Sequence, residues 1–290
     1  MILYTFGNLH KLSEENFADK LAEYAVRALL TEVCVTPKPG LVDRANSGAH
    51  SDMDIFTFIE SAVALYPYYR AIAVQSIEYG GPADSLLSAL QPMGIEAERT
   101  MLAVTKGVNT HKGAIFSLGV ICAAVSVLAK QKAEATPQNI SKVCAAITKS
   151  KTREEAASAA DTNGELVYRK HGISGILGEA SNGFSAVFNT ALIIIRKYTA
   201  KAVPLQDAAV AALLHLIATV DDTNVAARCG AGVLRDIQAK VSVRISGFDS
   251  ISQYLCFAKE LDAEFTQRNI SPGGCADLLA AALLMHCILP

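Results

Sequence analysis

The hydrophobic positions of this 290-residue chain recur mainly at the spacing of an α-helix. Sustained alternation of polar and apolar residues, the pattern of a strand, is almost absent. The first periodic segment follows Ser13, a suitable N-cap, and continues to Val33. A second begins at Ser51 or Asp52, and Pro67 is placed to kink or end it. The beginning of the chain therefore predicts two amphipathic helices.

Start and stop signals divide the rest of the chain in the same way. Thr136-Pro137 is typical of an N-cap followed by proline in the first helical position, and Thr152 with Glu155 has the spacing of a capping box. Further helices are expected over residues 96–106, 110–130, 137–149, 153–170, 179–198, 206–220, 224–240, 249–268 and 272–289. Because no internal repeat or long linker separates these segments, we expect an all-α, multi-helix bundle with a single domain over residues 1–290.

The composition excludes several classes of protein. The 26 basic and 28 acidic residues nearly balance, so no overall basic field would hold nucleic acid or an anionic membrane. Two apolar runs, residues 113–129 and 273–289, would each cover only about 26 Å as helices, short of a hydrocarbon core of roughly 30 Å. No export signal precedes them, and the seven cysteines lack metal-binding spacing. We therefore expect a cytoplasmic protein with no membrane span and no nucleic-acid partner.

The segment between the first two helices, residues 36–54, is unusually rich in polar residues. Pro39 favours extended geometry at Lys38, so the ammonium group is presented from a stiff backbone, which suits a phosphate. The alternative is a solvated loop in which Asp52 caps the next helix and Asp43 pairs with Arg44. The candidate site residues of this segment are Lys38, Asp43, Arg44, Asn46 and His50.

A second polar segment, residues 107–113, lies at the start of the long apolar helix. His111 and Lys112 would place cationic side chains at the positive end of a helix dipole, a conflict that a bound anion would resolve. The alternative is that Asn109 or Thr110 is an ordinary N-cap and that Lys112 extends into water. All four residues are candidates for substrate binding or catalysis.

Adjacent carboxylates mark a third segment. Asp221 and Asp222 repel each other unless a cation joins them, and oxygen ligands suit Mg²⁺ held largely through substrate phosphates. Asp222 could instead be an N-cap. Arg228, a few residues later, is a candidate phosphate ligand.

Two glycine-rich helix starts complete the candidates. Ser271, Gly273 and Gly274 would expose backbone N–H groups to a phosphate, although close packing of helices explains the glycines equally well. Glu179 is the single ionisable group of a glycine-rich approach to a helix, so it is either a catalytic carboxylate or a partner of the helix dipole. The phosphate loop G-x-x-x-x-G-K-S/T, H-E-x-x-H and G-x-S-x-G are absent.

Five motifs, in the order TPKPGLVDRANSGAHSDMD, GVNTHKGAIFSLG, GEASNGF, DDTNVAARCG and SPGGCADLLA, closely resemble the triphosphoribosyl-dephospho-coenzyme A synthase family over nearly the whole chain. The resemblance implies an all-α enzyme that moves the triphosphoribosyl group of ATP onto the ribose 2'-hydroxyl of 3'-dephospho-coenzyme A and releases adenine. The opening motif is more similar to the citrate lyase branch than to the malonate decarboxylase branch. Leu177, Cys229 and Cys275 depart from the family pattern, where a basic residue, glycine and serine are usual.

The resemblance also implies roles for the candidates, because glycosyl transfer needs a carboxylate near the sugar, a base and a donor for the departing adenine. We expect Asp43 as base or oxocarbenium stabiliser, His50 or His111 as proton donor, and Glu179 as a further catalytic carboxylate. Asp221 and Asp222 would bind Mg²⁺. The expected substrate and phosphate ligands are Lys38, Arg44, Asn46, Asn109, Thr110, Lys112, Arg228, Ser271, Gly273 and Gly274.

The product would pass to a transferase that loads an acyl carrier protein, and a homo-oligomer is compatible with the sequence. Two alternatives remain open at this point. One is a nucleotide-dependent kinase or nucleotidyltransferase that acts on a coenzyme A precursor, and the other is a non-enzymatic helical scaffold.

Overall fold

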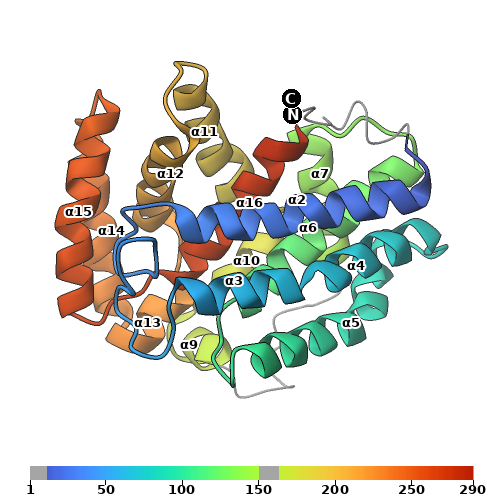
Figure 1. Ribbon diagram of the computed structural model, residues 1–290, viewed down its shortest axis with the longest axis horizontal. Coiled ribbons are helices and arrows are strands. Elements are labelled where there is room, and N and C mark those ends of the chain that lie inside the picture. Colours follow the sequence, from blue (N-terminus) through green and yellow to red (C-terminus); the bar gives the residue numbers. More distant parts are fainter. Residues whose placement is uncertain (1–11, 150–162, 290) are drawn as a thin grey trace.

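The computed structural model describes residues 12–149 and 163–289, and within these ranges it contains helices and no strand (Figure 1). The predicted all-α fold is thus confirmed. In chain order the helices are α2 (Glu14–Cys34), α3 (Ile55–Ala64), α4 (Tyr66–Glu78), α5 (Ala83–Val104), α6 (Lys112–Lys130), α7 (Pro137–Thr148), α9 (Asn163–His171), α10 (Gly175–Ser181), the π-helical turn η1 (Val187–Ala191), α11 (Leu192–Thr199), α12 (Leu205–Thr219), α13 (Thr223–Cys229), α14 (Ala231–Ile245), α15 (Ile251–Gln267) and α16 (Gly273–Ile288).

Helix starts with strong local signals lie where the sequence predicts them. The Ser13 side chain accepts a hydrogen bond from the backbone N–H of Asn16 at the start of α2. Thr136 caps α7 in the same way, with Pro137 in the first turn. The capping box predicted at Thr152 and Glu155 lies outside the described residues.

Several boundaries differ from the prediction, each for a local reason. The predicted interruption at Pro67 is present, since α3 ends at Ala64 and Pro67 lies in the first turn of α4, but a new helix follows at once. Helix α5 begins at Ala83, well before residue 96, and it contains Pro92. The segment predicted as one helix over residues 224–240 is divided into α13 and α14 by Gly230, whose φ of 95° is left-handed. Residues 179–198 form α10, η1 and α11 instead of one helix.

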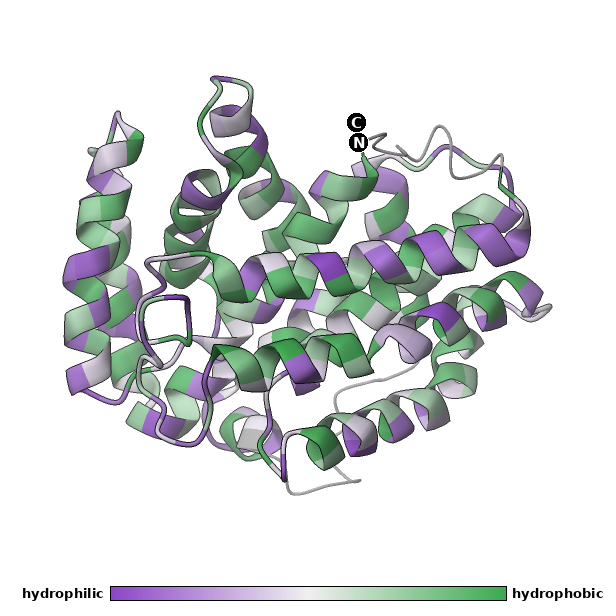
Figure 2. Ribbon diagram, viewed as in Figure 1, coloured by the Kyte–Doolittle hydropathy of each residue, from purple (hydrophilic) through white to green (hydrophobic). Residues whose placement is uncertain are grey.

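The apolar helices α6, α12 and α16 form the centre of the molecule. Helix α16 packs against α2, α6 and α12, while α4 and α7 also contact α6. The buried hydrophobic residues form one cluster that includes side chains from α2 through α16. In Figure 2, α16 is coloured mainly as hydrophobic, whereas α2 carries hydrophilic patches along its length. The amphipathic helices therefore cover an apolar centre.

One described helix, α6, is long and apolar enough to cross a membrane. It has 19 residues, two more than the predicted apolar run, because Lys112 and Lys130 are also helical. However, 72% of its apolar window is buried inside the molecule, and α4, α7 and α16 pack against it. Its hydrophobicity is accounted for by this central position.

Candidate active site

A main cavity of about 730 Å³ lies where the polar segments of the sequence meet. Its walls come from α2, the loop 36–54, α3, the start of α6, α9 and α10, and the starts of α13 and α16. In Figure 1 the loop 36–54, coloured blue, lies between the end of α2 and α13. The predicted site residues that line the cavity are Lys38, His50, Asn109, Thr110, His111, Lys112, Asp221, Asp222, Arg228, Ser271, Gly273 and Gly274.

The loop 36–54 is folded tightly against the segment that precedes α16. Gly40 has a φ of 66°, and a Cβ at this position would overlap the carbonyl oxygen of Ile270. The backbone N–H of Ala49 donates a hydrogen bond to the carbonyl oxygen of Gly40. This fold brings His50 to Ser271, and the His50 Nε2 lies 2.8 Å from the Ser271 Oγ.

Lys38 is buried at the cavity wall and is paired with an acid that the sequence analysis did not single out. Its Nζ donates to Glu32 Oε1 on α2 at 2.5 Å, and both side chains are almost fully buried. Burial raises the pKa of Glu32, and the charge of Lys38 opposes this shift. The ammonium group is therefore held in place before any phosphate arrives.

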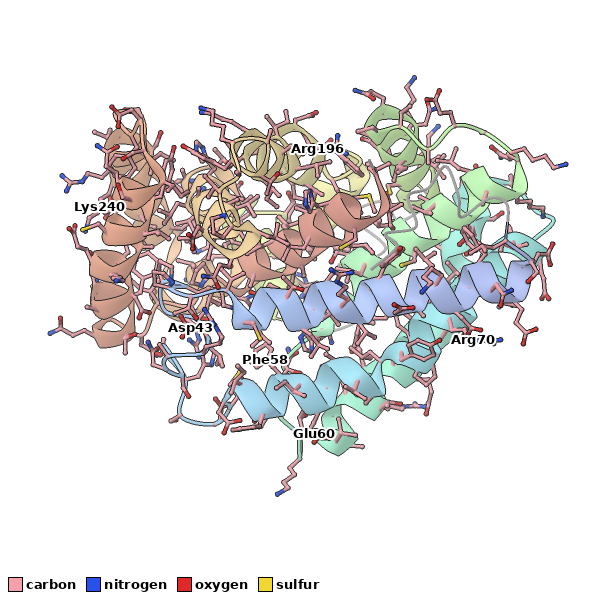
Figure 3. The ribbon with its side chains drawn as sticks, turned by 45° about the horizontal axis from the view of Figure 1, so that its top comes forward. Asp43, Phe58, Glu60, Arg70, Arg196 and Lys240 are labelled. Atoms are coloured by element: carbon pink, nitrogen blue, oxygen red, sulfur yellow. The ribbon has the colours of Figure 1, made fainter. Side chains whose placement is uncertain are left out.

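Asp43 is buried but does not line the cavity. One carboxylate oxygen accepts from the backbone N–H of Lys38, and the other accepts from Ala45 and Asn46. The Asp43 carboxylate thus ties the loop together and fixes the backbone of Lys38. Figure 3 shows Asp43 beyond the end of α2. Its predicted pairing with Arg44 does not occur among the described contacts.

Arg44, Asn46 and Glu179 also lie outside the cavity lining. Arg44 donates to Gln206, and both line a second cavity of about 660 Å³ beside α2. Asn46 donates to Asp262 on α15. Glu179 accepts from the backbone N–H of Ala186, and burial raises its pKa. The structure therefore does not place these three residues on the wall of the main cavity.

His111 is buried at the end of the cavity near α3. Its Nδ1 lies 2.7 Å from Ser61 Oγ, and Thr110 donates to the same oxygen. The ring of Phe58 packs edge-to-face against the imidazole, and in Figure 3 Phe58 lies between α2 and α3. Burial, followed by the charge of Lys38, lowers the pKa of His111 to about 3. The neutral form of His111 is therefore favoured near pH 7.

His50 is also shifted toward the neutral form. Burial lowers its pKa, and the charge of Arg228 adds to the effect. Arg228 lines the cavity and has no ion-pair partner within the described part of the chain. It is therefore a cation that remains available for a phosphate.

The start of α6 already has a hydrogen-bond acceptor, supplied by the protein. Asp277 on α16 accepts a hydrogen bond from the backbone N–H of Ala114, and it lies so close that a Cβ at Gly113 would overlap its carboxylate. Burial raises the pKa of Asp277 well above its ordinary value, and Glu32 and Asp222 add to the shift. Asn109 Oδ1 accepts from the backbone N–H of Lys112 in the turn before α6, but the N-cap of α6 is His111, not Asn109 or Thr110, and it makes no side-chain capping bond.

Asp222 joins the starts of two helices. Oδ1 accepts from the backbone N–H groups of Asn224 and Val225 in α13, and Oδ2 accepts from Cys275 in α16. Burial raises its pKa, and these donors oppose the shift. The alternative interpretation of Asp222 as an N-cap is therefore confirmed.

The pair Asp221 and Asp222 does not fit a metal site formed by the protein. Asp221 is bound to Arg235 at 2.5 Å, while both oxygens of Asp222 accept backbone hydrogen bonds. No cluster of three or more His, Cys, Asp or Glu side chains suited to a metal occurs in residues 12–149 or 163–289. Any Mg²⁺ would thus depend on substrate oxygens.

The glycines before α16 allow two helix starts to approach closely. A Cβ at Gly273 would lie 2.7 Å from Asn224 Nδ2, and one at Gly274 would lie 3.1 Å from Asp222 Oδ2. Close packing, the alternative given from the sequence, thus accounts for both glycines, although both also line the cavity.

Three residues with direct roles in this geometry were missed: Glu32, Ser61 and Asp277. Glu32 and Asp277 line the cavity, and Ser61 supports His111. A signal existed for Asp277, which is the single ionisable acid of an apolar helix. Glu32 and Ser61 have no comparable signal, because an acid or a hydroxyl in an amphipathic helix is ordinary.

A cavity that gathers cations, carboxylates and two histidines from segments far apart in the sequence is typical of an enzyme that acts on an anionic small molecule. Comparison with known proteins specifies the family. The sequence model of CitG, described as ATP:dephospho-CoA triphosphoribosyl transferase, matches residues 18–289. The chain belongs to this family, so it is a transferase that acts on ATP and dephospho-coenzyme A.

Individual relatives agree with this assignment. A protein of Vibrio cholerae serotype O1 (strain M66-2), named probable 2-(5''-triphosphoribosyl)-3'-dephosphocoenzyme-A synthase, is 40% identical over 90% of this chain and 86% of its own length. A Pectobacterium atrosepticum protein, named as the same synthase without "probable", is 38% identical over 89% of this chain and 86% of its own. The family and the transferase reaction predicted from the motifs are thereby confirmed.

Among solved structures, the putative triphosphoribosyl-dephospho-coA synthase of Archaeoglobus fulgidus has a TM-score of 0.46 and 17% identity to this chain. It covers 77% of this chain and 94% of its own.

Proposed function

We propose that this enzyme joins C1 of the ATP ribose to the 2'-oxygen of the ribose in 3'-dephospho-coenzyme A. The bond from C1 to adenine N9 breaks, the bond from C1 to oxygen forms, and the hydrogen lost from the hydroxyl is balanced by one gained by adenine. The triphosphate stays intact. The observation that supports this most directly is the convergence of Lys38, Arg228 and the carboxylates of Glu32 and Asp277 on one cavity without a phosphate loop.

Within this reaction we assign Arg228 and Lys112 to the triphosphate, with Lys38 close to the reacting sugar. Arg228 is unpaired in the described part of the chain, and a guanidinium binds phosphate through paired donors. Lys112 pairs with Glu98 at 2.9 Å, half-exposed at the cavity wall, and can exchange that partner for a phosphate oxygen. Lys38 is buried beside Glu32, deeper than either.

The carboxylates at the cavity suit the charge that develops on the sugar. An oxocarbenium-like transition state is stabilised by a nearby anion, and the attacking hydroxyl needs a base. Glu32 and Asp277 line the cavity, whereas Asp43 holds the backbone of Lys38 from outside it. We therefore propose Glu32, whose charge is supported by the Lys38 ammonium, as the anion, and Asp277, whose raised pKa suits proton transfer, as the base. Asp43 is proposed as a positioning residue, and its assignment as the base from the sequence stays a prediction.

Mg²⁺ is proposed as a companion of ATP, coordinated by triphosphate oxygens and water. It would neutralise part of the triphosphate charge, which suits a cavity that also contains several acids. Asp221 and Asp222 are not needed for this binding, since both carboxylates already have partners.

The wider setting follows from the family resemblance of the opening motif. We propose a single catalytic domain in the cytoplasm whose product passes to a transferase that loads the acyl carrier protein of citrate lyase. The continuous hydrophobic cluster supports the single domain.

The decisive test is to incubate the protein with ATP, Mg²⁺ and 3'-dephospho-coenzyme A and to follow the products by chromatography. We expect free adenine in equal amount to the coupled product. A kinase would release ADP and a nucleotidyltransferase would release pyrophosphate, so either product without adenine contradicts the proposal.

A further inference from the structure

The imidazole of His111 has one nitrogen without a partner. Nδ1 faces Ser61, but the buried Nε2 has no hydrogen-bond partner among the described residues. Leaving a buried polar group unpaired costs roughly 1–3 kcal/mol, so such a group in an enzyme cavity calls for an explanation. His111 lines the main cavity, and a bound substrate would supply the missing partner.

The hydroxyl groups on the other side of the ring determine which nitrogen carries the hydrogen. Thr110 Oγ1 donates to Ser61 Oγ at 2.8 Å, so the oxygen of Ser61 is already an acceptor. A hydroxyl oxygen can accept twice, but the Ser61 hydroxyl has no other acceptor for its own hydrogen among the described contacts, so that hydrogen is directed at His111 Nδ1, 2.7 Å away. An imidazole that accepts at Nδ1 carries its hydrogen on Nε2. The unpartnered nitrogen is therefore a donor.

We propose that Ser61 is a positioning residue that holds His111 as the Nε2–H tautomer, so that Nε2 donates a hydrogen bond to a ring nitrogen of the adenine that leaves ATP. This inference rests on the proposed function. A purine nitrogen is favoured over a phosphate oxygen because the donor is uncharged and the aromatic ring of Phe58 packs against the imidazole.

The chemistry requires no proton transfer from His111. As the bond from C1 to N9 breaks, its electron pair moves onto the purine and the other ring nitrogens become stronger acceptors. A neutral N–H directed at one of them stabilises this charge and keeps its own hydrogen. Adenine obtains its hydrogen from the hydroxyl of the acceptor ribose by way of water or a carboxylate, so the overall balance is unchanged.

The test compares Ser61→Ala with Ser61→Thr, which keeps the hydroxyl. We expect Ser61→Ala to lower kcat about tenfold with the KM for ATP changed less than about twofold, and Ser61→Thr to recover most of the loss. Ser126→Ala is the matched control, because Ser126 is an equally buried helical serine that donates only to the carbonyl oxygen of Cys122. A loss in the control as large as that in Ser61→Ala would overturn the proposal.

ATP analogues that lack a purine ring nitrogen identify the acceptor. With one of the three analogues 1-deaza-ATP, 3-deaza-ATP and 7-deaza-ATP as substrate, kcat should fall by a similar factor, and Ser61→Ala should then cause no further loss. A full tenfold effect of Ser61→Ala on all three analogues would overturn the assignment to adenine and point to a phosphate or ribose oxygen.

A measurement on the unchanged protein makes the proposal independent of how well the variants fold. The ¹⁵N shifts of His111 in the wild-type chain should show hydrogen on Nε2 and none on Nδ1; the reverse result would overturn it. This readout does not depend on turnover. Failure of the proposed function would appear separately, as wild-type protein that binds ATP but releases no adenine.

Discussion

Two groups of helix starts in the wall of the main cavity, which we call the Asp222 end and the His111 end, differ in what satisfies their polar groups. At one end the starts of α13 and α16 share the carboxylate of Asp222, which accepts three backbone hydrogen bonds. At the other end Asp277 binds the start of α6, but His111 retains a buried ring nitrogen without a partner among the described residues. The first end is complete within the protein, whereas the second is completed by a substrate.

One cavity thus contains polar groups that stabilise the fold and polar groups that remain available to a substrate. Both ends looked similar in sequence, since each combined a helix start with acidic or basic residues that suggested a phosphate. Helix N–H groups that already bind a carboxylate are not free for a phosphate. The triphosphate is therefore left to side chains such as Arg228, and the following predictions test how far the two ends differ.

The largest effect is expected at the Asp222 end. Asp222→Ala removes the acceptor of three N–H groups in two helix starts and should lower the free energy of unfolding by about 3 kcal/mol. Asp221→Ala is the matched control, because Asp221 forms an exposed ion pair with Arg235 whose loss should cost less than about 1 kcal/mol. Urea unfolding measures both. Equal losses, or a wild-type value for Asp222→Ala, would contradict the structural role.

The next effect concerns acid stability at the His111 end. The folded-state pKa of His111 is about 3, below the ordinary value of 6.5, so the unfolded chain takes up a proton first as the pH falls. This contribution to stability is complete well above pH 6.5 and is lost progressively between pH 6.5 and 3. Between pH 7.5 and 5 the loss amounts to about 2 kcal/mol.

The measurement is the free energy of unfolding of wild type and His111→Gln at both pH values. Glutamine does not titrate, so the variant should lose about 2 kcal/mol less than wild type over this interval. The other histidines titrate in both proteins and cancel in the comparison. An identical pH dependence of the free energy of unfolding in the two proteins would show that His111 takes up its proton as readily in the folded chain as in the unfolded chain.

How much of this was predictable depends on whether the signal was local. Ser13 and Thr136 cap helices through residues three positions away, so the sequence alone located those starts. Lys38 and His111 stood out because their surroundings in the sequence were unusual. Ser61 is important because it contacts His111, 50 positions away in the sequence, and Glu32 because it contacts Lys38, 6 positions away. Only the fold brings these side chains together.

The site assignments that the geometry does not favour have the same origin. Asp43 was expected at the reacting sugar because an acid in a polar loop looks available, but local backbone N–H groups occupy its oxygens. Asp221 and Asp222 are adjacent in sequence but have partners in different directions. Sequence proximity indicated the right segments and could not indicate the orientation of each side chain.

Replacing Arg228 tests whether this unpaired cation of the cavity wall binds a phosphate of ATP. Arg228→Gln should raise the KM for ATP about tenfold with kcat changed less than about threefold, because the lost contact is to a group that does not react. Arg235→Gln, which removes a surface partner of Asp221, should leave both constants near wild type. A fall in kcat with unchanged KM would instead place Arg228 at the reacting centre.

Lys112 should give the smallest effect, although it lies next to His111 in sequence. Its half-exposed ammonium group forms an ion pair with Glu98, so the group must exchange Glu98 for a phosphate when ATP binds. Lys112→Gln should therefore raise the KM for ATP only about threefold, and raising the ionic strength should reduce the difference from wild type. Glu98→Gln frees the ammonium and should lower the KM for ATP, whereas it should have no effect once Lys112 is also replaced by glutamine. If Glu98→Gln instead raised the KM in the presence of Lys112, the pair would act as a unit that positions the start of α6, and the triphosphate would lie closer to Arg228 alone.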